Sequence, residues 1–181
     1  TGGRTIKDMI MPMEKHVIQL EINGPAATGM PEMECDPAGF QSTLPTQHLH
    51  IYFEDPDIGM SVGVWDTSTM QEAFGTYPGD EFIWVLEGDF KMLDGNGGAV
   101  ECPKNACVSF RNAVPVSWKQ VGYLKKFYIT YLDPNAETPK IDSADGGIHV
   151  LDPNAKMTVM DTPEPFEIVG KPPVQKDHNT F

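Results

Sequence analysis

Basic residues are scarce in this sequence. Lysine and arginine together number 13 against 26 aspartate and glutamate residues, so the formal net charge is −13. Arg4 and Arg111 are the two arginines. Because phosphate recognition needs clustered cations, this composition is that of a poor nucleic-acid binder, and it disfavours an anionic membrane surface for the same reason. We therefore expect neither nucleic acid nor membrane among the partners.

Long apolar runs and cysteines are also few. No stretch approaches the roughly 18 consecutive apolar residues that a membrane-spanning helix needs. The three cysteines (Cys35, Cys102 and Cys107) are too few for a disulfide framework, and their odd number fits reduced thiols in the cytosol. Residues 1–13 lack the apolar segment of a secretory signal. These features favour a cytoplasmic protein.

The apolar residues occur instead in short runs, and no long amphipathic helical pattern is present. The runs are rich in β-branched and aromatic residues, and 17 glycines and 16 prolines punctuate the chain between them. Strands at this spacing indicate an all-β sandwich or barrel. The runs lie at 17–22, 49–53, 60–65, 82–86, 107–110, 114–118 and 124–132.

Turn-forming residues separate several of these runs. Residues 93–98 contain Asp-Gly and Asn-Gly, which predict a hairpin between two strands. Asp55-Pro56 and Asp133-Pro134 have the chemistry of type I turns.

The two ends of the chain differ from its middle, which predicts three regions. Residues 1–47 form an N-terminal arm with one strand at 15–22, and residues 48–132 form the barrel core. Residues 133–181 form a C-terminal hairpin and a proline-rich arm, which cannot be helical. The hairpin, over 148–160, is predicted by an echo of residues 55–67 at 152–162, although chance explains that echo equally well.

The central stretch carries a family resemblance. Residues 81–88 (Glu-Phe-Ile-Trp-Val-Leu-Glu-Gly), the hairpin after them, and then residues 103–105, 108–110 and 114–118 resemble the two signature motifs of the cupins. Cupins are small jelly-roll barrels, so the resemblance implies a double-stranded β-helix with N- and C-terminal arms.

One branch of the cupins fits best. Residues 62–66, 77–82, 117–118 and 125–128 resemble the ureidoglycine-aminohydrolase-like cupins, which include an ethanolamine-utilisation protein. This resemblance covers roughly residues 51–131. It is informative for the fold and weaker for function, because one barrel supports many chemistries.

The sequence departs from the family at the metal site. Metal-binding cupins place a His-x-His pair before the glutamate that Glu81 matches, and another histidine in the second motif. Those positions hold Phe74, Thr76 and Val116 here, none of which ligates a divalent cation. Because such sites take three or more protein ligands, Glu81 alone does not hold a metal, and we expect no cofactor.

A second histidine pair lies upstream. Residues 48–54 read His-x-His-x3-Glu, and on a strand His48, His50 and Glu54 would share one face. A polar surface stripe is the favoured interpretation. A relocated metal site is the alternative, either here or with His48 or His50 beside Glu81 across neighbouring strands.

The resemblance also implies the residues of a pocket. Glu81 faces the cavity in the family pattern, as a general acid or base, or else as the partner of a salt bridge with Lys126. Tyr77 is the expected hydrogen-bond donor, and Lys126 the expected electrostatic clamp.

The pocket walls are expected to be aromatic. Trp65 and Trp118 match aromatic family positions and either wall a ligand pocket or fill the barrel core. Phe74, Thr76 and Val116, at the positions of the missing histidines, are predicted to contact ligand as well.

Strand alternation makes a prediction about the outside of the barrel. Over residues 81–85 it places Ile83 and Val85 inside with Glu81, and Trp84 outside. An outward tryptophan favours a covered face such as a subunit interface, so we expect a homodimer.

These observations leave three functional hypotheses. The first is a cupin that binds or converts a small polar metabolite with amino or ureido groups, with aminohydrolase- or lyase-like chemistry if it is an enzyme. The second is a non-catalytic ligand-binding or assembly cupin. The third is a metalloenzyme that uses a relocated His48/His50 site.

Overall fold

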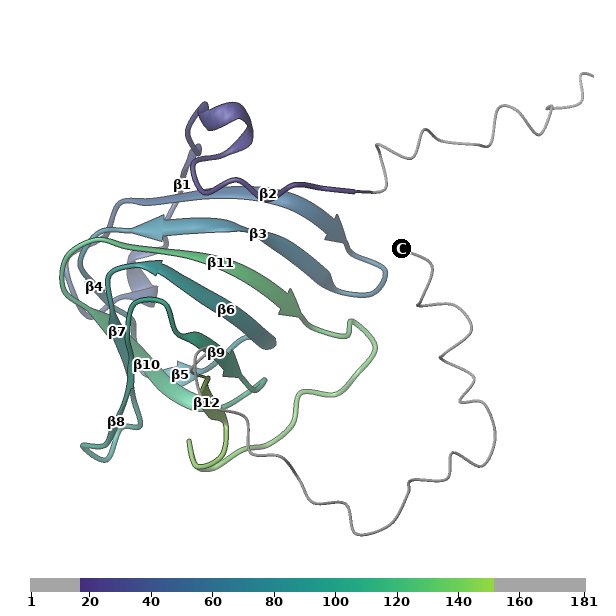
Figure 1. Ribbon diagram of the computed structural model, residues 1–181. Coiled ribbons are helices and arrows are strands. Elements are labelled where there is room, and N and C mark those ends of the chain that lie inside the picture. Colours follow the sequence, from purple (N-terminus) through teal and green to yellow (C-terminus); the bar gives the residue numbers. More distant parts are fainter. Residues whose placement is uncertain (1–16, 152–181) are drawn as a thin grey trace, which may run out of the picture.

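The computed structural model describes residues 17–151, and β-strand is the main regular secondary structure in this part of the chain (Figure 1). None of its helices is long and apolar enough to cross a membrane. The short 3-10 helices are η3 (Pro25–Ala27) and η4 (Pro37–Gly39). The strands are β1 (Glu32–Met33), β2 (Gln47–Asp55), β3 (Met60–Thr67), β4 (Met70–Gln71), β5 (Gly75–Thr76), β6 (Asp80–Glu87), β7 (Phe90–Leu93), β8 (Ala99–Cys102), β9 (Cys107–Phe110), β10 (Pro115–Gln120), β11 (Leu124–Tyr131) and β12 (Ile148–Leu151).

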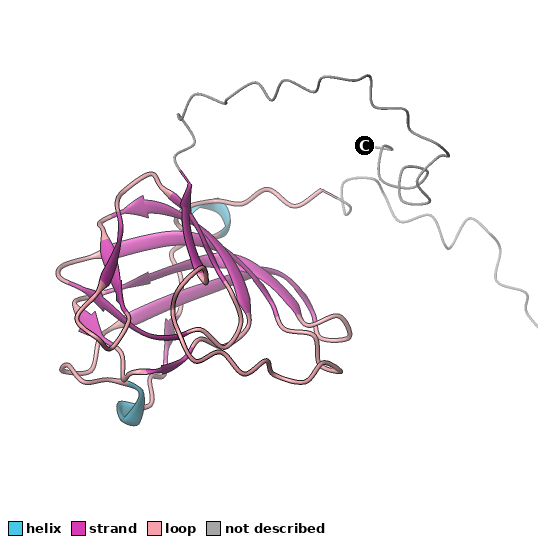
Figure 2. Cartoon of the chain, turned by 90° about the horizontal axis from the view of Figure 1, so that it is seen from below, coloured by secondary structure: helices cyan, strands magenta, loops and turns pink. Residues whose placement is uncertain are grey.

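The strands form two antiparallel sheets that enclose the core (Figure 2). The larger sheet has the order β1-β2-β3-β11-β6-β9-β12, and the smaller has the order β4-β10-β7-β8, with β5 also paired to β10. Strands distant in sequence, such as β3 and β11, are neighbours, as a jelly roll requires. The predicted all-β jelly-roll architecture is confirmed.

The predicted hairpin joins β7 and β8, and Leu93 pairs with Ala99 beside its loop. The Asp94 carboxylate accepts the backbone N–H groups of Asn96 (2.8 Å) and Gly98 (2.9 Å), so this side chain closes the turn. The turn residues at 93–98 therefore predicted this hairpin, which is confirmed.

The strand predicted at 15–22 is wrong over its described part. Residues 17–22 form a single bridge, between Ile22 and Gly24, and Val17 is 77% exposed. β1 pairs with the edge of β2 instead, so the earlier segment is attached by side chains: the Tyr52 hydroxyl donates to the Glu21 carbonyl at 2.8 Å. Of the hairpin predicted at 148–160, β12 is present, and the remainder lies outside the described residues.

Aromatic stacking fills the space between the sheets. Trp118 of β10 stacks on Phe90 of β7, with centroids 3.7 Å apart and planes 3° apart, and Phe110 packs beside them. Ile83 and Val85 are fully buried, while Trp84 is 48% exposed, so the predicted alternation of β6 is confirmed. This core holds the inner face of β6 against the smaller sheet.

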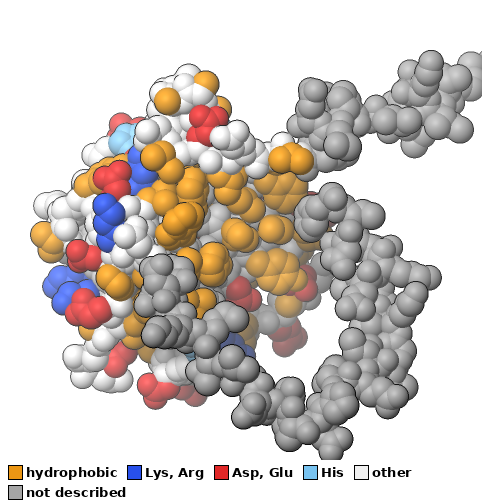
Figure 3. Space-filling model, viewed as in Figure 1, with side chains coloured by type: hydrophobic (Ala, Val, Ile, Leu, Met, Phe, Trp, Pro, Cys, Tyr) orange, Lys and Arg blue, Asp and Glu red, His pale blue; other side chains and the backbone are white. Residues whose placement is uncertain are grey.

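The outer face of the larger sheet is unusually apolar (Figure 3). Two rows of directly paired residues cross β2, β3, β11, β6, β9 and β12 on this face, and neither row contains Asp, Glu, Lys or Arg. We name six of these residues the outer apolar patch: Phe53, Val62, Phe82, Trp84, Phe127 and Ile129.

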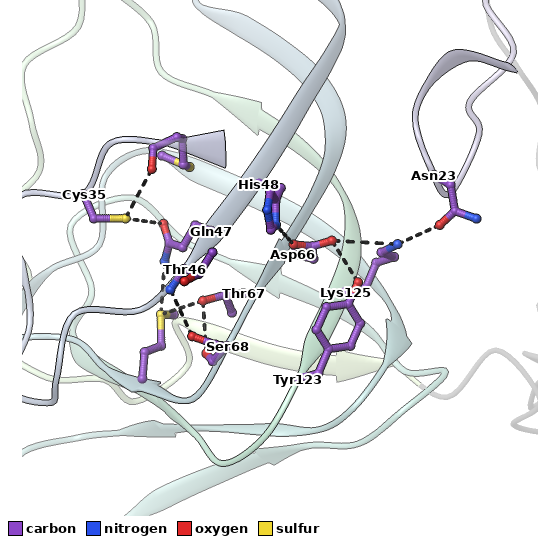
Figure 4. Close-up of polar contacts among 12 residues, drawn as sticks. Asn23, Cys35, Thr46, Gln47, His48, Asp66, Thr67, Ser68, Tyr123 and Lys125 are labelled. Carbon is purple, nitrogen blue, oxygen red and sulfur yellow. Dashed lines mark hydrogen bonds and ion pairs between the residues drawn. The ribbon is translucent and has the colours of Figure 1, made fainter. Parts of the chain in front are cut away.

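The buried Asp66 is linked through Lys125 to Asn23, in the segment before β1, on this face of the sheet (Figure 4). The Asp66 carboxylate contacts His48 Nδ1 at 2.7 Å, accepts the Tyr123 hydroxyl at 2.8 Å and lies 3.8 Å from Lys125 Nζ. Lys125 in turn donates to Asn23 at 2.8 Å. Asp66 therefore compensates a lysine whose side chain is only 8% exposed.

We expect Asp66→Asn to lower the free energy of unfolding by about 3 kcal/mol, because it leaves the Lys125 ammonium buried without an anion. Glu101→Gln is the matched control, since it breaks an exposed pair with Lys91 and should leave stability nearly unchanged. Urea-induced unfolding measures both variants. Equal effects would contradict the role assigned to Asp66.

Candidate functional site

A cavity of about 260 Å³ lies at the inner face of the larger sheet. β2, β3, β6 and β11 contribute most of its wall, and Trp118 of β10 closes it from the smaller sheet. Its lining combines aromatic, apolar and charged side chains: Met33, Phe40, Gln47, Leu49, Trp65, Glu72, Tyr77, Glu81, Trp118, Lys126, Tyr128 and Thr130.

Glu81 is the central charged group of this cavity and is only 7% exposed. Lys126 Nζ donates to one of its carboxylate oxygens at 2.8 Å, and the Tyr77 hydroxyl donates to the other. Antiparallel pairing of β6 with β11 brings the glutamate and the lysine to the same inner face. Both oxygens of the buried carboxylate are therefore satisfied by the chain itself.

The Lys126 ammonium lies between two tryptophans. Its Nζ is 4.9 Å from the centroid of Trp65 and 4.7 Å from that of Trp118, which are cation–π distances. Trp118 is held in turn by its stack on Phe90. The aromatic walls therefore orient a positive charge as well as exclude water.

Tyrosine hydroxyls complete the polar part of the cavity. Burial raises the pKa of Tyr77 well above its ordinary value, and the neighbouring Glu81 charge raises it further. Burial also raises the pKa of Tyr128. This ring packs over Gly63, where a Cβ would lie 2.6 Å from the Tyr128 hydroxyl. Both phenols remain neutral hydrogen-bond donors at physiological pH.

Glu72 is a cavity residue that the sequence analysis missed. Its backbone N–H donates to the Trp118 carbonyl at 2.8 Å, and its carbonyl accepts the Ser117 hydroxyl at 2.6 Å. Burial raises the pKa of its carboxyl, the Lys126 ammonium opposes that rise, and Glu81 adds to it. Glu72 follows the two-residue strand β4, which is too short for an alternating pattern to reveal its orientation.

The structure brings five of the predicted site residues together around the cavity: Glu81, Tyr77, Lys126, Trp65 and Trp118. Their functional roles stay predictions.

The three residues at the missing histidine positions do not line this cavity. Val116 is buried in the core, and Thr76 is exposed on β5. Phe74 is 48% exposed and lines a separate groove beside Asp94 and Gly95. Phe74 and Thr76 lie just before and in the short strand β5, whose two residues are exposed, and Val116 lies on β10 of the smaller sheet.

The upstream histidines also lie apart from Glu81. β3 and β11 separate β2 from β6, so the pairing of His48 or His50 with Glu81 across neighbouring strands is wrong. His48 contacts Asp66 on the outer face, and His50 packs edge-on against Tyr52 with centroids 4.5 Å apart.

The side chains around the cavity do not fit a metal ion of the kind that metal-binding cupins hold. Within residues 17–151, no group of three or more His, Cys, Asp and Glu side chains is placed to hold a metal. The Glu81 carboxylate is already engaged by Lys126 and Tyr77. The residues of this cavity therefore do not fit a metal centre.

No family model matches the chain, and no curated protein matches it. A DUF861-family protein of unknown function from Pseudomonas syringae pv. tomato is similar in structure, with 25% identity and a TM-score of 0.52 over 55% of this chain and 43% of its own length. This chain thus spans less than half of that protein.

Two further solved structures are more distant. The EutQ protein of Clostridium difficile is 14% identical, with a TM-score of 0.43 over 57% of this chain and 83% of its own. A cupin superfamily protein of Desulfitobacterium hafniense is 13% identical, with a TM-score of 0.42 over 64% of this chain and 99% of its own.

The strand order and the facing antiparallel sheets give the chain a cupin-like jelly-roll fold, the double-stranded β-helix that the motifs implied.

The Lys126–Glu81 pair can be tested by a double-mutant cycle. Lys126→Met should lower the free energy of unfolding by about 3 kcal/mol, because it leaves Glu81 buried without its cation. Adding Glu81→Gln should restore much of that loss, since the amide carries no charge. Urea-induced unfolding of the two single variants and the double variant measures the coupling. A double variant no more stable than Lys126→Met would contradict the buried pair.

Proposed function

We propose that this cupin-type protein binds a small polar metabolite with amino or ureido groups in the cavity, with Glu81, Tyr77 and Lys126 at its reacting end. The observation that carries the proposal is the convergence of these three polar groups in one small, aromatic-walled cavity. Ligand sites typically combine apolar walls with a few placed polar groups. A cavity of about 260 Å³ suits a metabolite rather than a polymer.

The geometry supports acid–base chemistry of an aminohydrolase- or lyase-like kind. Glu81 could accept a proton from a ligand N–H group, with Tyr77 as its hydrogen-bonding neighbour. Lys126 could stabilise negative charge that develops on a ligand oxygen. The amino or ureido character of the ligand rests on the resemblance of residues 62–66 and 77–82 to the ureidoglycine-aminohydrolase-like cupins.

A thermal-shift screen of small ureido, amino and carboxylate compounds tests this proposal, together with elemental analysis of the purified protein. A compound that binds the native state raises the melting temperature by mass action. We expect a hit whose effect is lost in Glu81→Gln and kept in Glu101→Gln, which lies on the exposed strand β8.

Two results would count against the proposal. One is unchanged binding and turnover of the hit in Glu81→Gln. The other is stoichiometric Mn, Zn, Fe or Ni in the protein, which would direct attention to His48 and His50. A hit that depends on Glu81 without any turnover would identify a non-catalytic binding cupin.

A second proposal, self-assembly, is favoured by the outer apolar patch. We propose that a second copy of the chain covers it. Two chains of net charge −13 repel each other, so contact is most favourable where neither presents a charged side chain, as in the two rows that form this patch. Sheet faces also pack well against one another.

We expect Trp84→Lys to shift the protein from dimer to monomer in sedimentation velocity, because it buries a charge in the contact. Val121→Lys is the control, since Val121 is 84% exposed in the turn before β11, outside the outer apolar patch. A native protein that sediments as a monomer, or a Trp84→Lys variant that remains dimeric, would refute this assembly.

A further inference from the structure

The cavity is lined by more acidic than basic side chains. Two carboxylates, Glu72 and Glu81, and one ammonium, Lys126, line it. Lys126 bonds to Glu81 at 2.8 Å, whereas the Glu72 carboxylate forms no hydrogen bond with another side chain in the described part of the chain. When Glu72 is ionised, the cavity therefore carries one uncompensated negative charge.

The walls around this carboxylate are suited to a cation. Phe40 is bridged to Glu72 through the backbone, and Trp65, Tyr77 and Tyr128 line the same cavity. Aromatic faces attract cations, and Trp65 and Trp118 already do so with Lys126 Nζ at 4.9 and 4.7 Å. The net charge of −13 also draws cations toward the molecule from solution.

We infer that the ligand is a small organic ammonium ion and that Glu72 is the residue that pairs with its charge. This inference rests on the proposed function, because it concerns the same cavity. An anionic ligand would meet two carboxylates, and a neutral ligand would leave the negative charge of Glu72 without a counter-charge in the cavity. An ammonium ion supplies the missing positive charge and hydrogen bonds to Glu72.

The inference predicts the pH dependence of binding. Four other ionisable groups line the cavity with Glu72: Lys126 and Tyr128 from β11, Glu81 from β6, and Tyr77 from the segment before it. Because burial raises the pKa of the Glu72 carboxyl, it holds its proton to higher pH than an exposed glutamate does. Ammonium binding should expel that proton, so affinity should rise as pH increases through the raised pKa and level off above it.

Calorimetric titration with ethylammonium, propanol and propionate tests the charge class. We expect ethylammonium to bind in the cavity of the native protein, and propanol and propionate to bind at least about tenfold more weakly. Glu72→Gln keeps the size of the side chain and should weaken ethylammonium binding about tenfold or more, whereas Glu101→Gln should leave it unchanged. Titrations in two buffers of different ionisation enthalpy measure the proton released. Urea unfolding checks that Glu72→Gln is folded.

The outcomes separate this inference from the proposed function. If a neutral or anionic compound binds in a Glu81-dependent manner and ethylammonium does not bind, the proposed function stands and the ammonium inference is overturned. Ethylammonium binding that survives Glu72→Gln does not depend on Glu72 and overturns the inference as well. If no compound of any class binds, the proposed function fails together with this inference.

Discussion

The buried ion pair between Lys126 and Glu81 is the interaction on which the cavity depends. Taking both charges out of water is costly, and the cost is offset only by close geometry and further hydrogen bonds. The structure provides these through the Tyr77 hydroxyl on the carboxylate and the two indole faces beside the ammonium. The pair links β6 to β11, two strands already joined along their backbones, and it lies in the wall of the cavity.

Sequence reasoning predicted most of the sheet and part of the site. Short apolar runs located β2, β3, β6, β9, β10 and β11, because these runs are rich in the β-branched and aromatic residues that favour strands. The strand predicted at 17–22 is absent because apolar content does not show whether a strand edge is free to pair. The edge of β2 is already paired with β1. Glu72 escaped notice for a related reason: its position in the cavity comes from bonds to Trp118 and Ser117, which are remote in sequence.

The positions that the cupin resemblance aligns with metal-ligating histidines hold residues with other roles in this chain. Val116 packs in the core, and Phe74 lies over Gly95 in a different groove. The negative charge of Glu81 is compensated by Lys126. Glu81 is thus paired with a lysine side chain instead of a metal ion. The fold alone therefore does not identify the chemistry.

Two consecutive lysines of β11 point to opposite sides of the larger sheet. Lys125 meets Asp66 outside, Lys126 meets Glu81 inside, and both are buried. A shift of β11 by one residue would place each lysine on the opposite face of the sheet and separate both ammonium groups from their carboxylates. Apolar residues lie on both faces of this strand, so hydrophobicity alone discriminates weakly against such a slip. Lys125 and Lys126 therefore specify the register of β11, because a shifted register would separate both buried lysines from their carboxylates. The apolar side chains on the two faces of the strand would tolerate such a shift.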